Sequence, residues 1–149
     1  MNEELQTVLT KIQSILNDTD LDKLIETILQ RLVSFGCTPT KDDVFSIAYG
    51  IQKVQNHILN VTNQAVVPDG LFELNVDMVC GEVLNGKFLS GQLDLTALDL
   101  DGMIQSVKEG DTQVNFSAEG SDETKAQELF RWLMQGKGSD LLCYRKMRW

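Results

Sequence analysis

The side chains best suited to nucleophilic or metal chemistry are few in this chain. It contains one histidine, His57, and three cysteines, Cys37, Cys80 and Cys143. A nucleophilic cysteine needs an imidazole partner, and nothing in the sequence supports such a pair with His57. The cysteines lie far apart and form no Cys-x-x-Cys pair, which favours reduced thiols over a disulfide framework or a zinc site. His57 lies near the edge of an apolar helical stripe, so we expect a structural histidine and no enzyme, metal site or cofactor.

Two short glycine-containing stretches resemble ligand loops, but both lack essential residues. The sequence GKGS at 136–139 lacks the full GxxxxGK[ST] phosphate-loop pattern and follows a predicted helix where a strand should stand. In the stretch LDLDG, aligning Gly102 with the glycine of a calcium loop places Ala97 first and Lys108 at the bidentate-glutamate position. We therefore expect neither a nucleotide site nor a calcium site.

The sequence LLCYRKMRW at the carboxy-terminal end is the stretch most suited to binding another molecule. Its last six residues combine two aromatic and three cationic side chains, and arginine and aromatic residues dominate protein interfaces. Docking to a protein surface is the favoured interpretation, with Tyr144, Arg145, Arg148 and Trp149 as contact residues. The alternatives are that Trp149 folds back onto the chain's own helices, or that the segment stacks nucleic-acid bases and contacts phosphates.

The net charge of −9 is unevenly distributed along the chain. Residues 1–124 carry 7 basic and 20 acidic side chains, a balance of −13, whereas residues 125–149 carry 6 basic and 2 acidic side chains, a balance of +4. An acidic body repels free nucleic acid, and a basic end can seek an acidic partner surface. The alternative interpretation is that net charge serves solubility and that its location is incidental.

Apolar residues at helical spacing predict the elements that must position these side chains. Stripes of this kind cover residues 3–16, 20–35, 40–59, 69–84 and 123–134. Gly36 ends the second helix, Thr40 caps the third and Pro68 opens the fourth. Gly50, inside the third helix, indicates close helix packing. The fourth helix is apolar around most of its circumference, which predicts the centre of a bundle, and residues 140–149 form a last short helix or an extended tail.

One stretch, SVKEGDTQVNF, departs from the helical pattern. After a loop at 91–102, alternating side chains predict two strands at 104–108 and 112–116, joined by a turn around Gly110. A lone two-stranded hairpin is marginal in water. It must therefore pack on the bundle or on another copy of the chain, and the sequence leaves both possibilities open.

Together these patterns predict a mainly α fold. We expect one domain, residues 1–149, built as a helical bundle of about four to six helices with one β-hairpin insertion near 104–116. A domain of this length buries roughly 70% of the surface that its unfolded chain exposes. No apolar run approaches the ~20 residues of a membrane span, and the first residues have no signal-peptide pattern. We therefore expect a cytoplasmic protein without a membrane partner.

From about Leu21 to Trp149 the chain resembles the head–tail connector proteins of long-tailed bacteriophages and prophages, also called adaptor or head-completion proteins. The resemblance depends most on KEGDT at 108–112 and YRKMRW at 144–149, set in a helical body. Members of that family are small helical-bundle proteins that assemble into a ring beneath the portal after DNA packaging. The resemblance therefore implies a structural virion protein that extends the DNA channel and joins the head to the tail.

The resemblance also implies partners and contact residues. In a ring, Val107, Asp111, Val114 and Phe116 of the hairpin would contact the neighbouring subunit, and the segment 140–149 would dock onto the portal or onto a tail or stopper protein. DNA would pass only as cargo, because an acidic channel does not bind phosphates. The protein would act in the bacterial host's cytoplasm and then at the virion's head–tail interface. The alternative function is a monomeric helical interaction or regulatory module of prophage origin.

Overall fold

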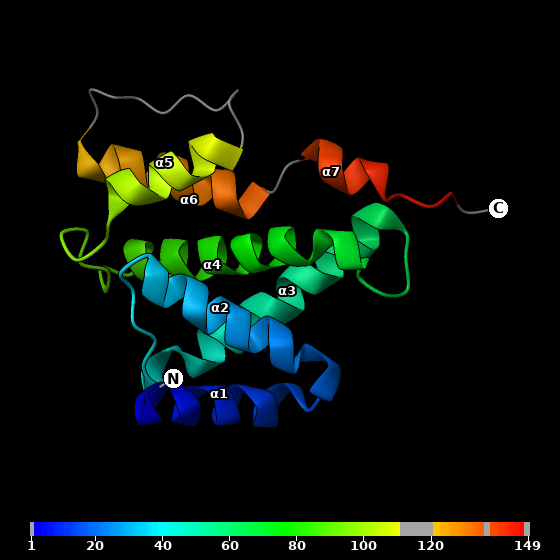
Figure 1. Ribbon diagram of the computed structural model, residues 1–149, viewed down its shortest axis with the longest axis horizontal. Helices are drawn as coiled ribbons and strands as arrows, with labels where there is room; N and C mark the ends of the chain where they lie inside the picture. Colours follow the sequence, from blue (N-terminus) through cyan, green and yellow to red (C-terminus); the bar gives the residue numbers. More distant parts are fainter. Residues whose placement is uncertain (1, 111–120, 136–137, 148–149) are drawn as a thin grey trace.

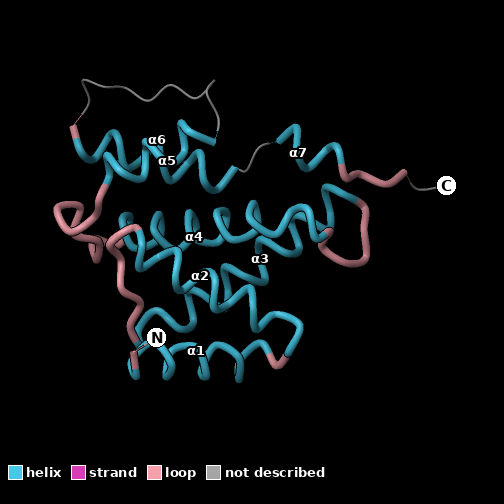
Figure 2. The backbone as a smooth tube through the Cα atoms, in the orientation of Figure 1, coloured by secondary structure: helices cyan, strands magenta, loops and turns pink. Residues whose placement is uncertain are grey.

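The computed structural model describes residues 2–110, 121–135 and 138–147. Within these ranges the chain forms seven α-helices, three short 3-10 turns and no strand (Figures 1 and 2). The helices are α1 (Glu3–Leu16), α2 (Asp22–Ser34), α3 (Val44–Thr62), α4 (Phe72–Leu89), α5 (Leu100–Gly110), α6 (Asp122–Gln135) and α7 (Gly138–Cys143). The turns η1 (Thr19–Leu21), η2 (Lys41–Asp43) and η3 (Asp69–Leu71) precede α2, α3 and α4. The predicted mainly helical bundle is confirmed.

Helix α4 lies at the centre of the bundle. It contacts α2 and α3 on one side and α6 on the other, while α1 packs against α2 and α3 at the edge (Figure 1). Because neighbours surround α4, it buries side chains on most of its circumference. The buried residues are Asn75, Val76, Met78, Val79, Cys80, Gly81, Val83 and Leu84. The prediction that this segment is the core helix is confirmed.

The junction after α2 shows why the chain turns at this point. The N–H groups of Gly36 and Cys37 donate to carbonyl groups in the last turn of α2, in the Schellman arrangement. Gly36 has a φ of 93°, and a Cβ atom there would lie 2.5 Å from the carbonyl oxygen of Ala97. A side chain at this position would be strained by the backbone and obstructed by the loop that precedes α5.

The start of α3 depends on a buried carboxylate. The N–H of Thr40 donates to Asp43 Oδ2 at 2.9 Å, completing a capping box, and Lys87 Nζ lies 3.1 Å from the same oxygen. Asp43 is only 6% exposed, so its charge is compensated by one cation and by the cap. This pair joins the end of α4 to the beginning of α3, and it has a structural role.

Two buried glycines lie on faces where helices meet. A Cβ atom added to Gly81 of α4 would lie 2.7 Å from Leu133 Cβ and 2.9 Å from the backbone nitrogen of Met134 in α6. A Cβ atom added to Gly50 of α3 would meet its nearest neighbour, Val79, at 3.7 Å, an ordinary van der Waals distance. The close approach expected at Gly50 is therefore found at Gly81.

The prediction of a strand at 104–108 is wrong, because these residues belong to α5. Leu100 and Met103 are buried and Ile104 is half-buried, which is the spacing of a helical face. Asp99 accepts the N–H of Gly102 at 3.1 Å near the start of the helix. The apolar pattern from Ile104 onward therefore belongs to a helix that begins at Leu100, within the stretch that the sequence predicted to be a loop. Residues 112–116, the other expected strand, lie outside the described residues.

Other boundaries differ less. Of the segment expected at 140–149, the described residues form the end of α7, a turn at Tyr144 and three residues without regular secondary structure. Helix α6 matches the predicted helix at 123–134. Helix α4 continues to Leu89, beyond the predicted end at 84, and its Phe88 ring lies 6.1 Å from that of Phe130 in α6. Among the described helices, none is both long enough and apolar enough to cross a membrane.

Candidate docking site

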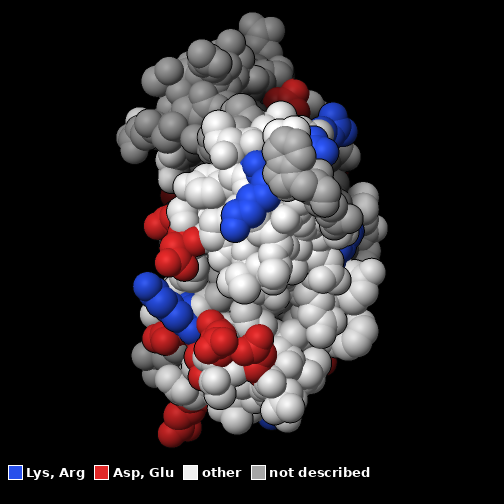
Figure 3. Space-filling model, turned by 90° about the vertical axis from the view of Figure 1, so that its right-hand side faces the viewer, with Lys and Arg blue, Asp and Glu red and all other residues white. Residues whose placement is uncertain are grey.

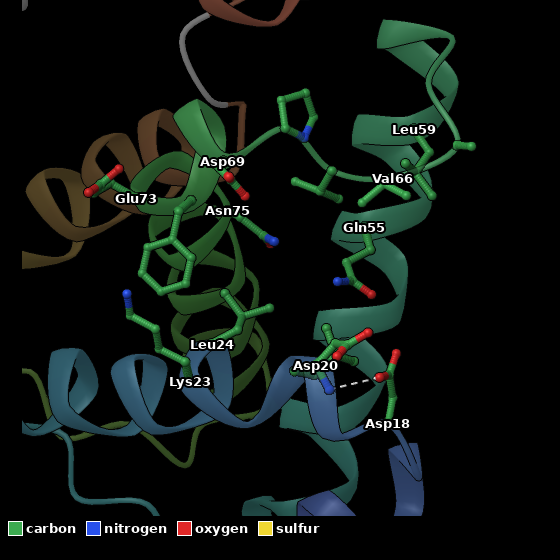
Figure 4. A pocket seen from close by; sticks show the side chains of 15 residues that line it. Asp18, Asp20, Lys23, Leu24, Gln55, Leu59, Val66, Asp69, Glu73 and Asn75 are labelled. Carbon is green, nitrogen blue, oxygen red and sulfur yellow. Dashed lines mark hydrogen bonds between the residues drawn. The ribbon is translucent and has the colours of Figure 1, made fainter.

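A pocket of about 890 Å³ lies between the start of α2, the second half of α3 and the start of α4 (Figure 4). We call it the α2–α4 pocket; its lining comes from residues 18–24, 55–59 and 65–75. Local turns shape its edges: Asp18 Oδ1 accepts the N–H of Asp20 at 3.0 Å, and Asn63, with a φ of 54°, ends α3. Two parts of the chain that are far apart in sequence, 18–24 and 55–75, therefore meet at one hollow.

The rim of the α2–α4 pocket is acidic and its walls are largely apolar. Four exposed carboxylates, Asp18, Asp20, Asp69 and Glu73, line it together with one basic residue, Lys23. The ammonium group of Lys23 lies 5.2 Å from the centre of the Phe72 ring, a cation–π arrangement. Leu21, Leu24, Leu59, Val66 and Val67 supply most of the remaining wall. Such a combination suits a ligand that has a cationic group on an apolar stem.

One polar group inside the pocket lacks a partner. Asn75 of α4 is only 3% exposed, and its Oδ1 atom has no hydrogen-bond donor among the residues that the structure describes. Figure 4 shows its amide extending from α4 into the space between α4 and α3, where Gln55 faces it. A buried carbonyl without a donor is rare in folded proteins and destabilises the fold. Beside the pocket, the Oδ1 atom of Asn75 is thus a buried acceptor without a donor among the described residues.

The C-terminal segment, which we define as residues 144–149, begins at the same end of the molecule (Figure 1). Leu141 of α7 is buried, and the N–H of Lys146 donates to the carbonyl of Thr62 at 2.7 Å. The amide of Gln64 donates to the carbonyl of Tyr144, whose ring lies directly over Gly70. The backbone at Tyr144 and Lys146 is thus held by Thr62 and Gln64, and the Tyr144 ring packs against η3.

The side chains of residues 145–147 are exposed to solvent. Arg145, Lys146 and Met147 are exposed, and Tyr144 is 36% exposed although its ring contacts Gly70. The fold-back interpretation concerns Trp149 and stays a prediction. Arg148 and Trp149 lie outside the described residues.

The expected subunit-contact residues are not brought together by the described part of the chain. Val107 lies in α5, in a helix and not in a strand. Asp111, Val114 and Phe116 lie outside the described residues. Their roles stay predictions.

Charges of both signs lie on this face of the molecule. Figure 3 shows Asp and Glu atoms at the left and in the lower part, with a further group near the top, and Lys or Arg atoms beside them and across the upper part.

The residues best suited to covalent chemistry are buried or isolated. Burial raises the pKa of Cys37 and, more strongly, that of Cys80, so both thiols stay protonated near neutral pH and are poor nucleophiles. Cys143 and His57 are exposed on different helices, α7 and α3. Within the described ranges, no group of three or more His, Cys, Asp or Glu side chains could hold a metal ion.

The α2–α4 pocket was not predicted from the sequence, because its lining residues extend from Asp18 to Asn75, 57 positions apart. One signal was present: Asn75 is a polar residue within the apolar stretch that forms the core helix. No protein-family model, curated protein or solved structure was found to match the chain. Function therefore has to be inferred from the residues and their arrangement.

Proposed function

We propose that this chain is a non-catalytic head–tail connector of a bacteriophage or prophage, which assembles into a ring between the portal and the tail. The proposal depends on one observation, the conformation of the first residues of the C-terminal segment. Its backbone is fixed by Thr62 and Gln64, while Arg145, Lys146 and Met147 extend into solvent. A fixed backbone lowers the entropy lost when these side chains bind another protein.

The charge distribution is consistent with this function. An acidic body does not retain DNA phosphates, so DNA can pass through a channel of such subunits as cargo. Many acidic copies repel one another, and contacts between the basic end of one copy and an acidic surface of the next reduce this repulsion. Assembly would take place in the host cytoplasm, and the ring would then remain at the virion's head–tail interface.

A pair of exposed aromatic rings offers a surface for contacts between copies. Phe45 and Tyr49 of α3 stack with ring centroids 6.2 Å apart and are 72% and 58% exposed. Aromatic side chains are enriched in protein interfaces relative to the remaining surface. We add this pair to Val107, Asp111, Val114 and Phe116 as residues that would contact a neighbouring subunit in the ring.

The proposal is tested by co-purification with the portal protein of the phage or prophage that encodes this chain, followed by measurement of the complex mass. We expect a ring-sized complex with the full-length chain and loss of that complex in the double variant Arg145→Glu/Lys146→Glu. Lys11→Glu, a charge reversal at an exposed position of α1, is the control and should keep the complex. Deleting 140–149 is a poorer test, because it removes the buried Leu141.

A monomeric helical interaction module is the second candidate function. The observations that favour it are the contacts of the C-terminal segment with its own bundle and the absence of a strand at 104–108. A chain that stays monomeric with the portal protein present, and does not co-purify with it, would exclude the connector in favour of this module.

A further inference from the structure

Phe45 and Tyr49 form an exposed aromatic surface at the start of α3. They are four residues apart, so they lie on one face of the helix. Their rings stack with an interplanar angle of 21°, and both side chains are more than half exposed. Covering two aromatic rings with another protein surface removes a large apolar area from water and is therefore favourable. The pair is a candidate contact surface.

A surface of complementary chemistry lies at the other end of α3. The N–H of Lys146 donates to the carbonyl of Thr62, the last residue of the helix. The neighbouring side chains of Arg145 and Met147 are exposed, Met147 to 74%. A guanidinium group stacks on aromatic rings, and a thioether makes favourable contacts with their edges. These are the side chains that an uncovered aromatic pair can bind.

Contacts of this kind already occur inside the chain. The guanidinium carbon of Arg31 lies 4.4 Å from the centre of the Phe35 ring, and Lys23 lies over the ring of Phe72. Both rings stand on or next to helices, as Phe45 does. The same cation–π geometry can therefore form between two helical surfaces of this protein.

The charges of the two surfaces favour the same contact. None of the ion pairs among the described residues includes Arg145 or Lys146. The exposed charged residues of η2 and of the first turn of α1, at the aromatic end of the bundle (Figure 1), are Glu3, Glu4, Lys41 and Asp42. Three of these four are acidic, so a cationic segment that approaches the aromatic pair meets charge mostly of opposite sign.

The two surfaces cannot meet within one copy of the chain. Tyr49 and Thr62 are 13 residues apart, which is about 20 Å along an α-helix. Because the backbone of Lys146 is bonded to Thr62, its exposed neighbours stay at that end of α3. A surface that meets a different surface of the next copy makes a head-to-tail contact, and contacts of this type can close into rings.

We propose that Arg145 and Met147 of one copy cover the aromatic pair of the next copy. The guanidinium group of Arg145 stacks on an exposed ring, Met147 packs against the ring edges, and Lys146 lies near the carboxylate of Asp42. This inference rests on the proposed ring, and it names the two surfaces that join neighbouring subunits.

The test cross-links two forms of the full-length chain, alone at high concentration and with the portal protein. The first form carries Gln52→Cys and Cys143→Ser, which places its exposed thiol three residues after Tyr49, on the face of the aromatic pair. The second form keeps the exposed Cys143, two residues before Arg145, and is isotope-labelled. After treatment with a short bismaleimide, mass spectrometry should find mixed dimers at least about tenfold more abundant than linked pairs of the first form.

Substitutions on each side of the contact should lower the yield of mixed dimers. Phe45→Ser/Tyr49→Ser in the first form should lower it about tenfold. Arg145→Gln/Met147→Ser in the second form should lower it by a similar factor, about tenfold. All four side chains are exposed, so their replacement leaves the core of the bundle unchanged.

Matched controls separate this contact from general association. Ile15→Ser/Leu89→Ser in the first form removes two exposed apolar side chains from other helices and should change the yield less than about twofold. Ser14→Cys in place of Gln52→Cys moves the thiol to an exposed position of α1. It should give about tenfold fewer mixed dimers.

The outcomes are distinct. Equal yields from Gln52→Cys and Ser14→Cys, or a yield unaffected by Phe45→Ser/Tyr49→Ser, would overturn the contact. Linked pairs of the first form as abundant as mixed dimers would mean that the aromatic surface meets itself across a two-fold axis, which also overturns it. A ring-sized complex with the portal protein but without mixed dimers would overturn this inference and leave the connector proposal intact. Mixed dimers from a chain that does not bind the portal protein would support the contact and overturn the connector.

Discussion

The unpartnered amide of Asn75 makes a sharp prediction about stability. Replacing Asn75 with leucine removes a buried carbonyl that has no donor within the described residues, and it places an apolar side chain next to open space. A buried polar group without its hydrogen bond costs about 1–3 kcal/mol. We therefore expect Asn75→Leu to raise the free energy of unfolding by about 1–2 kcal/mol, although most core substitutions lower it.

The assay is urea denaturation followed by circular dichroism, with thermal unfolding as a second measurement. For a domain of this length each kcal/mol corresponds to about 2–4 °C in Tm. Asn56→Leu is the matched control, because Asn56 is an exposed residue inside α3 and reports the difference in helix propensity alone. Subtracting its effect isolates the contribution of the buried carbonyl.

The reasoning is refuted if Asn75→Leu lowers the free energy of unfolding relative to Asn56→Leu by about 1 kcal/mol or more. That result would mean that the amide is satisfied in solution.

Three other predictions concern the glycines and the cysteines. In urea denaturation, Gly50→Ala should stabilise the protein by about 0.4–1 kcal/mol, since the new methyl group has room. Gly81→Ala should destabilise it by about 1–3 kcal/mol, because α6 must move. Effects of the same sign in the two variants would contradict the packing at these glycines. In the native protein a thiol reagent should modify Cys143 and leave Cys37 and Cys80 unmodified. Because folding raises the pKa of both buried thiols, their contribution to stability is complete below about pH 8.5 and declines as the pH rises above it. In unfolding curves measured at alkaline pH, the Cys37→Ala and Cys80→Ala variants should therefore lose less stability with rising pH than the unmodified chain.

Much of the helical architecture could be predicted from the sequence because the apolar stripes are long. The stripes of α1, α2, α3, α4 and α6 repeat over several turns, and the caps at Thr40 and Gly36 mark boundaries that the structure has. Helix α5 was misjudged because its pattern begins at Leu100, inside a stretch whose glycines and aspartates resemble a loop. A window that opens at Ile104 contains too little of the repeat to distinguish a helix from a strand.

The candidate site could be predicted less well from the sequence. The pocket depends on how α2, α3 and α4 cross, and no local pattern determines that crossing. The C-terminal segment is attached through hydrogen bonds to the backbone carbonyl groups of Thr62 and Tyr144. Such bonds cannot be predicted from the types of the side chains. Sequence reasoning could identify the segment as cationic and aromatic, and only the structure shows which atoms anchor it.

Gly36 has a consequence for the ancestry of this fold. Its backbone angle and the nearby carbonyl oxygen of Ala97 each disfavour a side chain at this position. Among proteins that descend from a common ancestor, surface residues change readily, whereas a residue restricted both by its backbone angle and by a close neighbour should change rarely. A glycine four residues before a Thr-x-x-Asp capping box should therefore persist in distant homologues after their overall similarity has disappeared, and it gives a short signature by which such relatives can be recognised.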